Sequence, residues 1–207
     1  MIAAVHPGAT LLASLATLIA GANSRWIDCP AVPRQRIYFA NHTSHLDFVV
    51  LWAALPEEIR PCTRPVAARE YWDRGWFRSY LAKNIFRSVL VSRPEGGLAG
   101  RDVLAPLLEQ LDRGNSLILF PEGTRGNGVE IGTFKSGLYH LCAAKPEVEA
   151  VPVYLENLNR ILPKGEFLPL PLLSRVTFGP PLLIAADEDK ASFLGRARLA
   201  LCRLRDL

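Results

Sequence analysis

The sequence predicts a single α/β domain in which a mostly parallel, mixed sheet is flanked by helices. Short apolar segments alternate with longer segments of helical character along most of the chain, a pattern typical of parallel strands covered on both faces. The length of 207 residues suits one domain with a substantial core. Apolar residues make up 49% and charged residues 21%, which excludes a disordered chain and a membrane protein of many spans.

The first predicted element of the domain is a buried strand at residues 37–40 (IYFA), an unbroken apolar run that ends in a polar, turn-like cluster. A helix is expected from about Ser44 to Leu55, because Pro56 cannot continue it. The next expected elements are a strand at 65–68, an aromatic and arginine-rich helix at 71–85, and a strand at 88–91.

The same alternation continues in the second half of the chain. A helix at about 98–113 leads into the apolar residues 116–120, a predicted strand that stops at a Pro-Glu-Gly turn. The elements expected after this turn are a helix at 135–144, strands at 150–155 and 175–178, and a closing helix at 190–205. Helices on both faces of one sheet therefore account for the whole domain.

The N-terminal residues 9–22 are apolar, but about 14 residues fall short of the roughly 20 that span a bilayer as a helix. A secretory signal peptide is disfavoured because the first Arg or Lys, Arg25, follows the apolar run. Arg25, Trp26, Arg34 and Arg36 are typical of a cytoplasmic membrane interface. We therefore expect an N-terminal apolar helix that lies in or re-enters the membrane surface; a helix packed on the core and a signal peptide remain alternatives. The expected division is a membrane-associating segment at 1–30 and a domain at 31–207.

The four cysteines are far apart in the sequence and form neither a C-x-x-C pair nor a Cys/His ligand cluster. Free thiols in a reducing compartment are favoured over a disulfide framework or a zinc site. We expect no bound metal and no redox chemistry. The four residues are Cys29, Cys62, Cys142 and Cys202.

His42 and Asp47 are the first candidate catalytic residues. Histidine is the side chain best suited to take a proton from an alcohol near neutral pH, and a carboxylate on its far nitrogen fixes the tautomer. A separation of five does not put both on one stripe of a regular helix. The two meet only if His42 precedes the helix and Asp47 lies in its first turn. The alternative is structural: Ser44 caps the helix and Asp47 satisfies first-turn N–H groups.

The segment Phe120–Arg125 (FPEGTR) places a glycine turn directly after an apolar strand. Ligands of open α/β sheets collect at the carboxyl ends of strands, where this turn is expected. Gly123 would let the backbone approach a ligand closely, and Arg125 can bind a phosphate through two parallel hydrogen bonds. The alternative is an ordinary turn with a solvated arginine. No G-x-G-x-x-G, Walker loop or G-x-S-x-G elbow is present, so nucleotide-binding and serine-hydrolase functions lose support.

Four blocks in this order resemble the glycerolipid acyltransferase family typified by 1-acylglycerol-3-phosphate acyltransferases. The first is His42-x4-Asp47 and the third, a very close match, is Phe120–Arg125. The second, Phe86–Arg93, lacks the family's usual glycine before the Phe and is the loosest match. The fourth is Val151–Val153; residues 134–137 and 178–181 also resemble family features.

The resemblance implies transfer of a fatty acyl group from acyl-CoA or acyl carrier protein to the hydroxyl of a membrane lysophospholipid, foremost 1-acylglycerol-3-phosphate. Another lysophospholipid or a lyso-aminolipid is the alternative acceptor, and a non-catalytic membrane-binding module is a further alternative. His42 would be the general base and Asp47 its orienting partner. Acceptor binding would fall to Arg93, Glu122, Gly123, Thr124, Arg125 and Lys135. No cofactor is implied beyond the acyl thioester, which is a co-substrate.

Positive charge is concentrated between Arg60 and Arg93, a stretch with eight basic and only two acidic residues. The net charge of the whole chain is +4. Together with the aromatic side chains at 71–85, this charge suits an anionic membrane surface. A core-packed helix with a solvated basic face is the alternative. No nucleic-acid motif supports binding of single-stranded nucleic acid. We therefore expect a membrane-associated protein at the cytoplasmic face.

Overall fold

A computed structural model of the chain describes residues 23–44, 47–73, 75–92, 101–126, 128, 130–156 and 174–207. Seven strands form one sheet in the order β1-β7-β6-β2-β5-β3-β4. All neighbouring pairs are parallel except β6 and β7, which run antiparallel. The strands are β1 (Asn23–Trp26), β2 (Arg36–Ala40), β3 (Thr63–Ala68), β4 (Val89–Val91), β5 (Ser116–Leu119), β6 (Glu149–Glu156) and β7 (Arg175–Phe178). The predicted single α/β domain with a mostly parallel, mixed sheet is confirmed.

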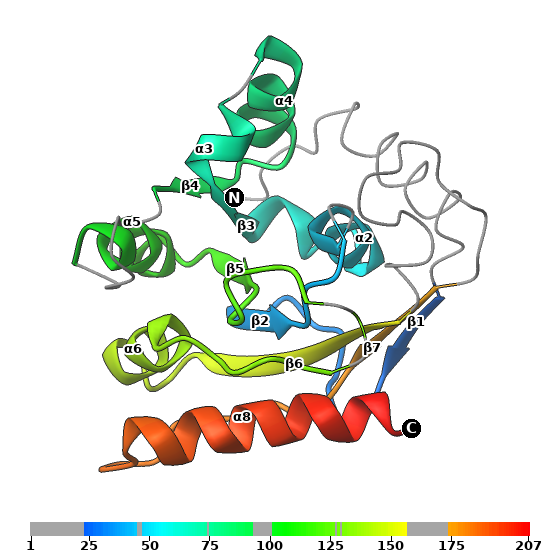
Figure 1. Ribbon diagram of the computed structural model, residues 1–207, viewed down its shortest axis with the longest axis vertical. Coiled ribbons are helices and arrows are strands. Elements are labelled where there is room, and N and C mark those ends of the chain that lie inside the picture. The colour runs from blue at the N-terminus through cyan, green and yellow to red at the C-terminus, as the bar shows by residue number, and fades with distance from the viewer. Residues whose placement is uncertain are drawn as a thin grey trace.

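Helices pack on both faces of this sheet, because residues of the central strands alternate between two apolar clusters. Tyr38 and Ala40 of β2 join the cluster that contains α2, whereas Ile37 and Phe39 join the cluster that contains α5, α6 and α8. Figure 1 shows α2 apart from α5, α6 and α8 across the central strands. The helices are α2 (Asp47–Ala54), η1 (Arg60–Cys62), α3 (Arg69–Trp72), α4 (Trp76–Tyr80), η2 (Leu81–Ile85), α5 (Arg101–Asp112), α6 (Gly137–Ala144) and α8 (Lys190–Arg205).

The helix expected at 71–85 is wrong as a single element. α3 ends after Trp72, and α4 begins only after Gly75, whose φ of +86° is a conformation that glycine adopts without strain. The turn η2 then follows α4 directly as a π-helix. The aromatic segment is therefore folded back in short pieces at one end of the molecule, where α3 and α4 project beyond the sheet (Figure 1).

Strand β1 was not predicted, and two of the four residues expected at a membrane interface, Trp26 and Arg36, are instead packed in the domain, whereas Arg25 and Arg34 are exposed. Trp26 pairs with Phe178 in the sheet register and stacks on its ring, with centroids 3.8 Å apart. Arg36 is fully buried, and its Nε donates to Glu149 Oε2 at 2.9 Å. These two side chains therefore contribute to the core instead of facing a membrane. The sheet also begins on the N-terminal side of the expected boundary at residue 30.

The apolar helix expected at residues 9–22 lies outside the described residues. Among the helices that the structure describes, none is both long and apolar enough to cross a bilayer.

Candidate active site

The two chemistry-bearing segments meet because their strands are neighbours in the sheet. Strands β2 and β5 are parallel, with Phe39 beside Leu119, so His42 and Phe120 follow at the same edge. The rings of His42 and Phe120 stack with centroids 4.5 Å apart and planes 26° from parallel. The site therefore lies at the carboxyl ends of parallel strands, where ligands of open α/β sheets bind.

His42 and Asp47 form the pair that their spacing predicted. His42 lies in the segment after β2, Asp47 is the first residue of α2, and His42 Nδ1 is 2.7 Å from Asp47 Oδ2. The same oxygen accepts the backbone N–H groups of Thr43, at 2.6 Å, and Ser44, at 2.9 Å. The capping role considered as an alternative is thus also present. Asp47 orients the imidazole and organises the turn before the helix at once.

The contact with Asp47 decides which imidazole nitrogen can act as a base. A carboxylate oxygen only accepts hydrogen bonds, so Nδ1 of His42 carries the proton and Nε2 has a free lone pair. The Asp47 side chain is fully buried, whereas 24% of the His42 side chain is exposed. The histidine is therefore held from the protein side and open toward a substrate.

The backbone of His42 is held by the segment that follows β5. Glu122 Oε1 accepts the His42 N–H at 2.9 Å, and the carbonyl of His42 accepts the Gly126 N–H at 2.7 Å. The second oxygen of Glu122 accepts the Gly132 N–H at 2.9 Å. Glu122 is buried, and both of its oxygens face backbone amides. The resemblance implied acceptor binding for Glu122, whereas these contacts connect it to the loops that carry the histidine.

Asn41 is a site residue that the sequence reasoning missed. Its side chain is buried, its Nδ2 donates to the Leu155 carbonyl at 3.0 Å, and its Oδ1 accepts the Leu155 N–H at 2.8 Å. These two bonds fix the segment before His42 to strand β6. A polar residue directly between a buried strand and a candidate base was the available signal.

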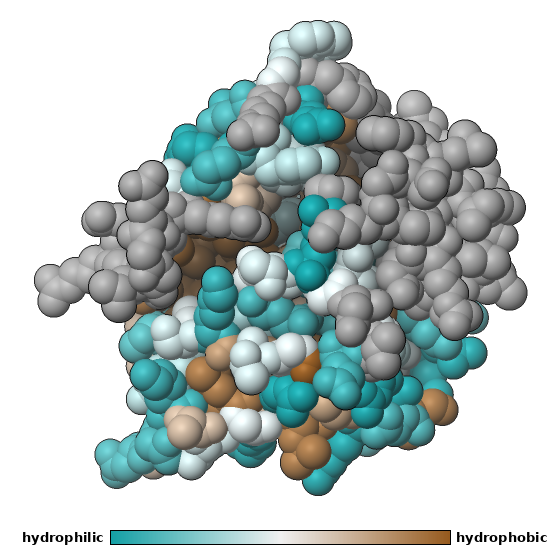
Figure 2. All heavy atoms as spheres, viewed as in Figure 1, coloured by the Kyte–Doolittle hydropathy of each residue, from teal (hydrophilic) through white to brown (hydrophobic). Residues whose placement is uncertain are grey.

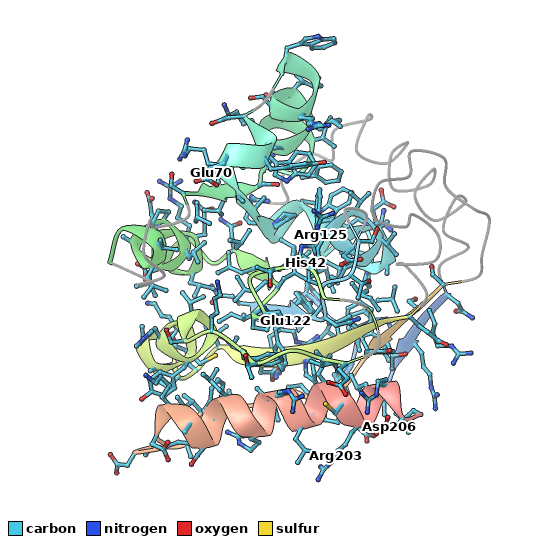
Figure 3. The ribbon with its side chains drawn as sticks, in the orientation of Figure 1. His42, Glu70, Glu122, Arg125, Arg203 and Asp206 are labelled. Atoms are coloured by element: carbon cyan, nitrogen blue, oxygen red, sulfur yellow. The ribbon has the colours of Figure 1, made fainter. Side chains whose placement is uncertain are left out.

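The turn after β5 brings a glycine and two cations together. Gly123 has a φ of +71°, and a Cβ built on it would lie 2.8 Å from Lys135 Cε and 2.9 Å from Lys135 Nζ. The Lys135 side chain therefore lies directly over this turn, and the backbone N–H of Lys135 donates to the Pro121 carbonyl at 2.8 Å. Thr124 and Arg125 are exposed. Figure 3 shows Arg125 and His42 close together near the centre of the molecule.

Arg125 is well placed to meet an anion. Its neighbour Gly126 bonds to the His42 carbonyl, so the Arg125 backbone runs beside that of the candidate base. Within the described part of the chain, no hydrogen bond or ion pair engages its guanidinium. Figure 2 shows that this face is hollowed near its centre and that apolar surface lines part of the hollow. A base, two cations and apolar surface thus share one face.

Arg93, the remaining predicted site residue, lies outside the described residues. The first part of the second block is described, and Phe86 is buried against Phe48 and Trp52 with ring centroids 5.0 Å and 5.3 Å apart. The fourth block, Val151–Val153, is buried in β6 beside β2. Both described segments contribute to the core that supports the site.

The described cysteines differ in exposure: Cys29 and Cys142 are buried, Cys202 is half-buried and Cys62 is exposed. No three His, Cys, Asp or Glu side chains in the described ranges are placed to hold a metal ion. Burial raises the pKa of the Cys142 thiol to about 12, so this thiol stays protonated at neutral pH.

A sequence model of the family described as Acyltransferase matches residues 30–156. A 1-acyl-sn-glycerol-3-phosphate acyltransferase of Limnanthes alba is 27% identical over 150 residues, covering 72% of this chain and 50% of the relative. A lyso-ornithine lipid O-acyltransferase of Pseudomonas aeruginosa is 28% identical over 165 residues, covering 79% of this chain and 54% of the relative. The chain thus spans about half the length of these curated relatives.

The fold is also similar to a solved structure. The crystal structure of the 1-acyl-sn-glycerophosphate acyltransferase PlsC from Thermotoga maritima superposes with a TM-score of 0.75 at 16% sequence identity. The superposition covers 96% of this chain and 78% of that chain. At this level of identity, the likeness establishes a shared fold.

Proposed function

The chain belongs to the acyltransferase family, and on that premise we propose that it transfers a fatty acyl group from an acyl thioester to the free hydroxyl of a lysophospholipid. The leading acceptor is 1-acylglycerol-3-phosphate, which would yield phosphatidic acid. The observation that carries this proposal is the contact of His42 Nδ1 with buried Asp47, because it leaves Nε2 of a partly exposed histidine free to take a proton.

In the proposed reaction, His42 Nε2 removes the proton of the acceptor hydroxyl as its oxygen attacks the thioester carbonyl. The new C–O bond forms, the C–S bond breaks, and the thiolate leaves. The proton on His42 then passes to the thiolate, so the histidine is regenerated. Asp47 stabilises the imidazolium that exists between these two transfers. The reaction needs no cofactor besides the thioester, either acyl-CoA or acyl carrier protein.

The anionic headgroup would be bound by the turn after β5. Arg125 offers two parallel N–H donors, which match two phosphate oxygens, and Lys135 adds a second positive charge over Gly123. Gly123, with no Cβ, lets the Lys135 side chain and its charge lie against the backbone of the turn. The apolar surface on the same face suits acyl chains (Figure 2).

A lyso-aminolipid is the second candidate acceptor, and the relative named as a lyso-ornithine lipid O-acyltransferase favours it. Such a lipid presents a single carboxylate where a lysophosphatidic acid presents a doubly charged phosphate. Arginine binds either group in a bidentate manner. A second cation at the turn, as Lys135 provides, favours the group with more charge.

The remaining parts of the proposal concern the chain outside the site. We propose that the apolar part of residues 1–30, at 9–22, associates with the membrane, that the domain which follows carries the transfer activity, and that the enzyme works at the cytoplasmic face. Nucleic acid is not among the proposed partners.

An acceptor panel tests the proposal. The full chain is incubated with radiolabelled acyl-CoA or acyl carrier protein and one acceptor at a time, and the lipid that gains label is identified. Label in 1-acylglycerol-3-phosphate alone supports the leading acceptor, whereas label only in lyso-ornithine lipid supports the second. If no acceptor gains label with either donor, the proposed transfer is wrong and a non-catalytic membrane-binding role remains.

A further inference from the structure

The segment Arg69–Ile85, which comprises α3, α4 and η2, forms a projection that we call the aromatic tip. It leaves the sheet after β3 and returns to it at β4. Figure 1 shows α4 as the outermost part of one end of the molecule, with α3 between α4 and the sheet. Among the described elements, α4 packs mainly against η2, the turn that follows it.

Two large aromatic side chains are exposed on the short helix α4. Trp76 is 82% exposed and Tyr80 is 45% exposed. They are four residues apart, so they lie on the same face of the helix. Of the large apolar residues that are exposed, among those whose side chains the structure describes, only these two are aromatic. Trp and Tyr combine a broad apolar ring with a polar group. They are enriched at membrane–water interfaces, where the ring contacts an apolar environment and the polar group contacts water.

The base of the tip attaches it to the domain. The Trp72 ring packs edge-on against Phe48, 5.1 Å between centroids. Asp73 lies 2.8 Å from Lys83 Nζ and 3.6 Å from Arg69 Nη1, so these ion pairs connect both ends of the segment. The tip is therefore held at its base, whereas Trp76 is exposed.

The tip is also positively charged. Residues 69–85 contain four basic side chains and two acidic ones, an excess of two, and Arg87 follows shortly after the segment. The Arg78 guanidinium lies over the Tyr71 ring, 4.7 Å from its centroid, and Arg87 is exposed. Cations that flank exposed Trp and Tyr complement the phosphates of anionic lipids.

We propose that the aromatic tip is a membrane-contact surface: Trp76 and Tyr80 enter the headgroup region of an anionic bilayer, and the surrounding cations bind lipid phosphates. The convex shape favours a bilayer over an acidic protein partner, because a fluid surface needs no complementary pocket for a protruding Trp. The inference rests on the proposed function in one respect, since a lipid acceptor would reach His42 from the membrane.

Tryptophan fluorescence of the full chain tests the contact directly. The other three tryptophans are less exposed: Trp52 is buried, Trp26 stacks on Phe178, and Trp72 packs on Phe48. Vesicles of phosphatidylcholine and phosphatidylglycerol with brominated acyl chains should quench the fluorescence of Trp76. This quenching should disappear in Trp76→Phe. Absence of quenching, or equal quenching in Trp76→Phe, would overturn the proposal.

Vesicle affinity provides the second measurement. The double variant Trp76→Ser/Tyr80→Ser should bind the anionic vesicles about tenfold more weakly or worse. Leu199→Ser is the matched control, because Leu199 is 51% exposed on α8 and should not alter binding. The intact chain should bind phosphatidylcholine vesicles more weakly than anionic ones. Equal affinity of the double variant and the intact chain, or of the two vesicle types, contradicts the inference.

Turnover separates this inference from the proposed function. The double variant should retain transfer to a detergent-dispersed acceptor and lose it with acceptor in vesicles. His42→Ala should lose transfer in both formats and keep the Trp76 quenching. If the double variant instead lost transfer only from acyl carrier protein, without any quenching in the intact chain, the tip would be a carrier-protein contact and the proposal would be wrong.

Discussion

Glu122 accepts the backbone N–H of His42 through Oε1 at 2.9 Å, so a carboxylate after β5 fixes the histidine that follows β2. Its other oxygen bonds the Gly132 amide. The loop after β2 and the loop after β5, 80 residues apart in the sequence, are therefore joined at one buried side chain. The contact sets the position of the candidate base without touching its ring.

Glu122→Ala should lower kcat by about tenfold or more and leave the KM for the acceptor nearly unchanged. Two backbone N–H groups would lose their acceptor, at a cost of about 1–3 kcal/mol each, and the His42 loop would shift. Steady-state kinetics and thermal unfolding measure both effects. Glu109→Ala, which removes an exposed carboxylate from α5, is the control. A rise in KM alone would show that Glu122 contacts the acceptor.

His42→Ala should abolish measurable acyl transfer while the protein remains folded. General-base catalysis raises reaction rates roughly 10²–10⁴-fold. Among the described residues, His42 is the histidine that contacts Asp47, so no other described imidazole can replace it. Transfer of labelled acyl groups and circular dichroism provide the readouts. His140→Ala is the matched control, because His140 is exposed on α6. Near-normal turnover in His42→Ala would remove the histidine from the mechanism.

Asp47→Asn should reduce kcat by on the order of 10²–10⁴-fold, since a neutral amide stabilises the imidazolium poorly and permits the wrong tautomer. Stability should also fall, because Oδ2 of Asp47 accepts three N–H groups that one amide oxygen serves less well. Kinetics under conditions where the variant is fully folded separate the two effects. An unchanged kcat with reduced stability would leave Asp47 only its capping role.

Arg125→Ala should raise the apparent KM for a phosphate-bearing acceptor about 10–100-fold, the equivalent of one bidentate charge-assisted contact. The kcat should change little, because a contact with the headgroup would hold the acceptor equally in the ground state and in the transition state. Arg175→Ala is the control, because Arg175 is exposed on β7, which β6 and β2 separate from β5 in the sheet. An unchanged KM would indicate a structural arginine or a different acceptor.

Glu149→Gln should remove part of the acid sensitivity of the fold. Partial burial acts to raise the pKa of Glu149, but hydrogen bonds and charges from Arg36 and Arg34 outweigh it and hold this pKa below its ordinary value of 4.5. The ionised form therefore stabilises the native state above pH 4.5, and this contribution is lost as the pH falls through the lowered native pKa.

Urea unfolding at pH 7 and pH 3 measures this effect. At pH 7 the substitution should cost on the order of 3 kcal/mol, because Arg36 is fully buried, and the cost should shrink toward pH 3. Glu156→Gln is the control, since Glu156 forms an exposed ion pair with Arg175, with 3.6 Å between Oε2 and Nη1. A cost that does not depend on pH would contradict the ionic contribution.

Local patterns predicted most of the fold. Apolar runs marked six of the seven strands, and Pro56 marked the end of α2. Strand β1, with the sequence NSRW, has no apolar run that would mark it as a strand. It forms by pairing with β7, which lies about 150 residues away in the sequence. The break at Gly75 was missed because the aromatic residues on both sides fit a helical pattern.

The site residues that contact each other over a short sequence distance were predicted, and those whose partners are distant in the sequence were missed. His42 and Asp47 could be inferred from their spacing and a helix start. The structural contacts of Asn41 with Leu155 and of Arg36 with Glu149 could not, since the partners lie 114 and 113 residues away. Burial of a polar residue follows from its tertiary partner, which a local pattern does not reveal.

Strand β2 is synthesised long before either of its neighbours. His42 finds Glu122 after 80 further residues, and Asn41 finds Leu155 after 114. A nascent chain must therefore carry this apolar strand with both edges unpaired while much of the domain is still to be made, a state prone to aggregation. The high contact order also favours slow folding. Catalytic competence thus arrives late in synthesis, and chaperone demand should be greatest before β6 has emerged.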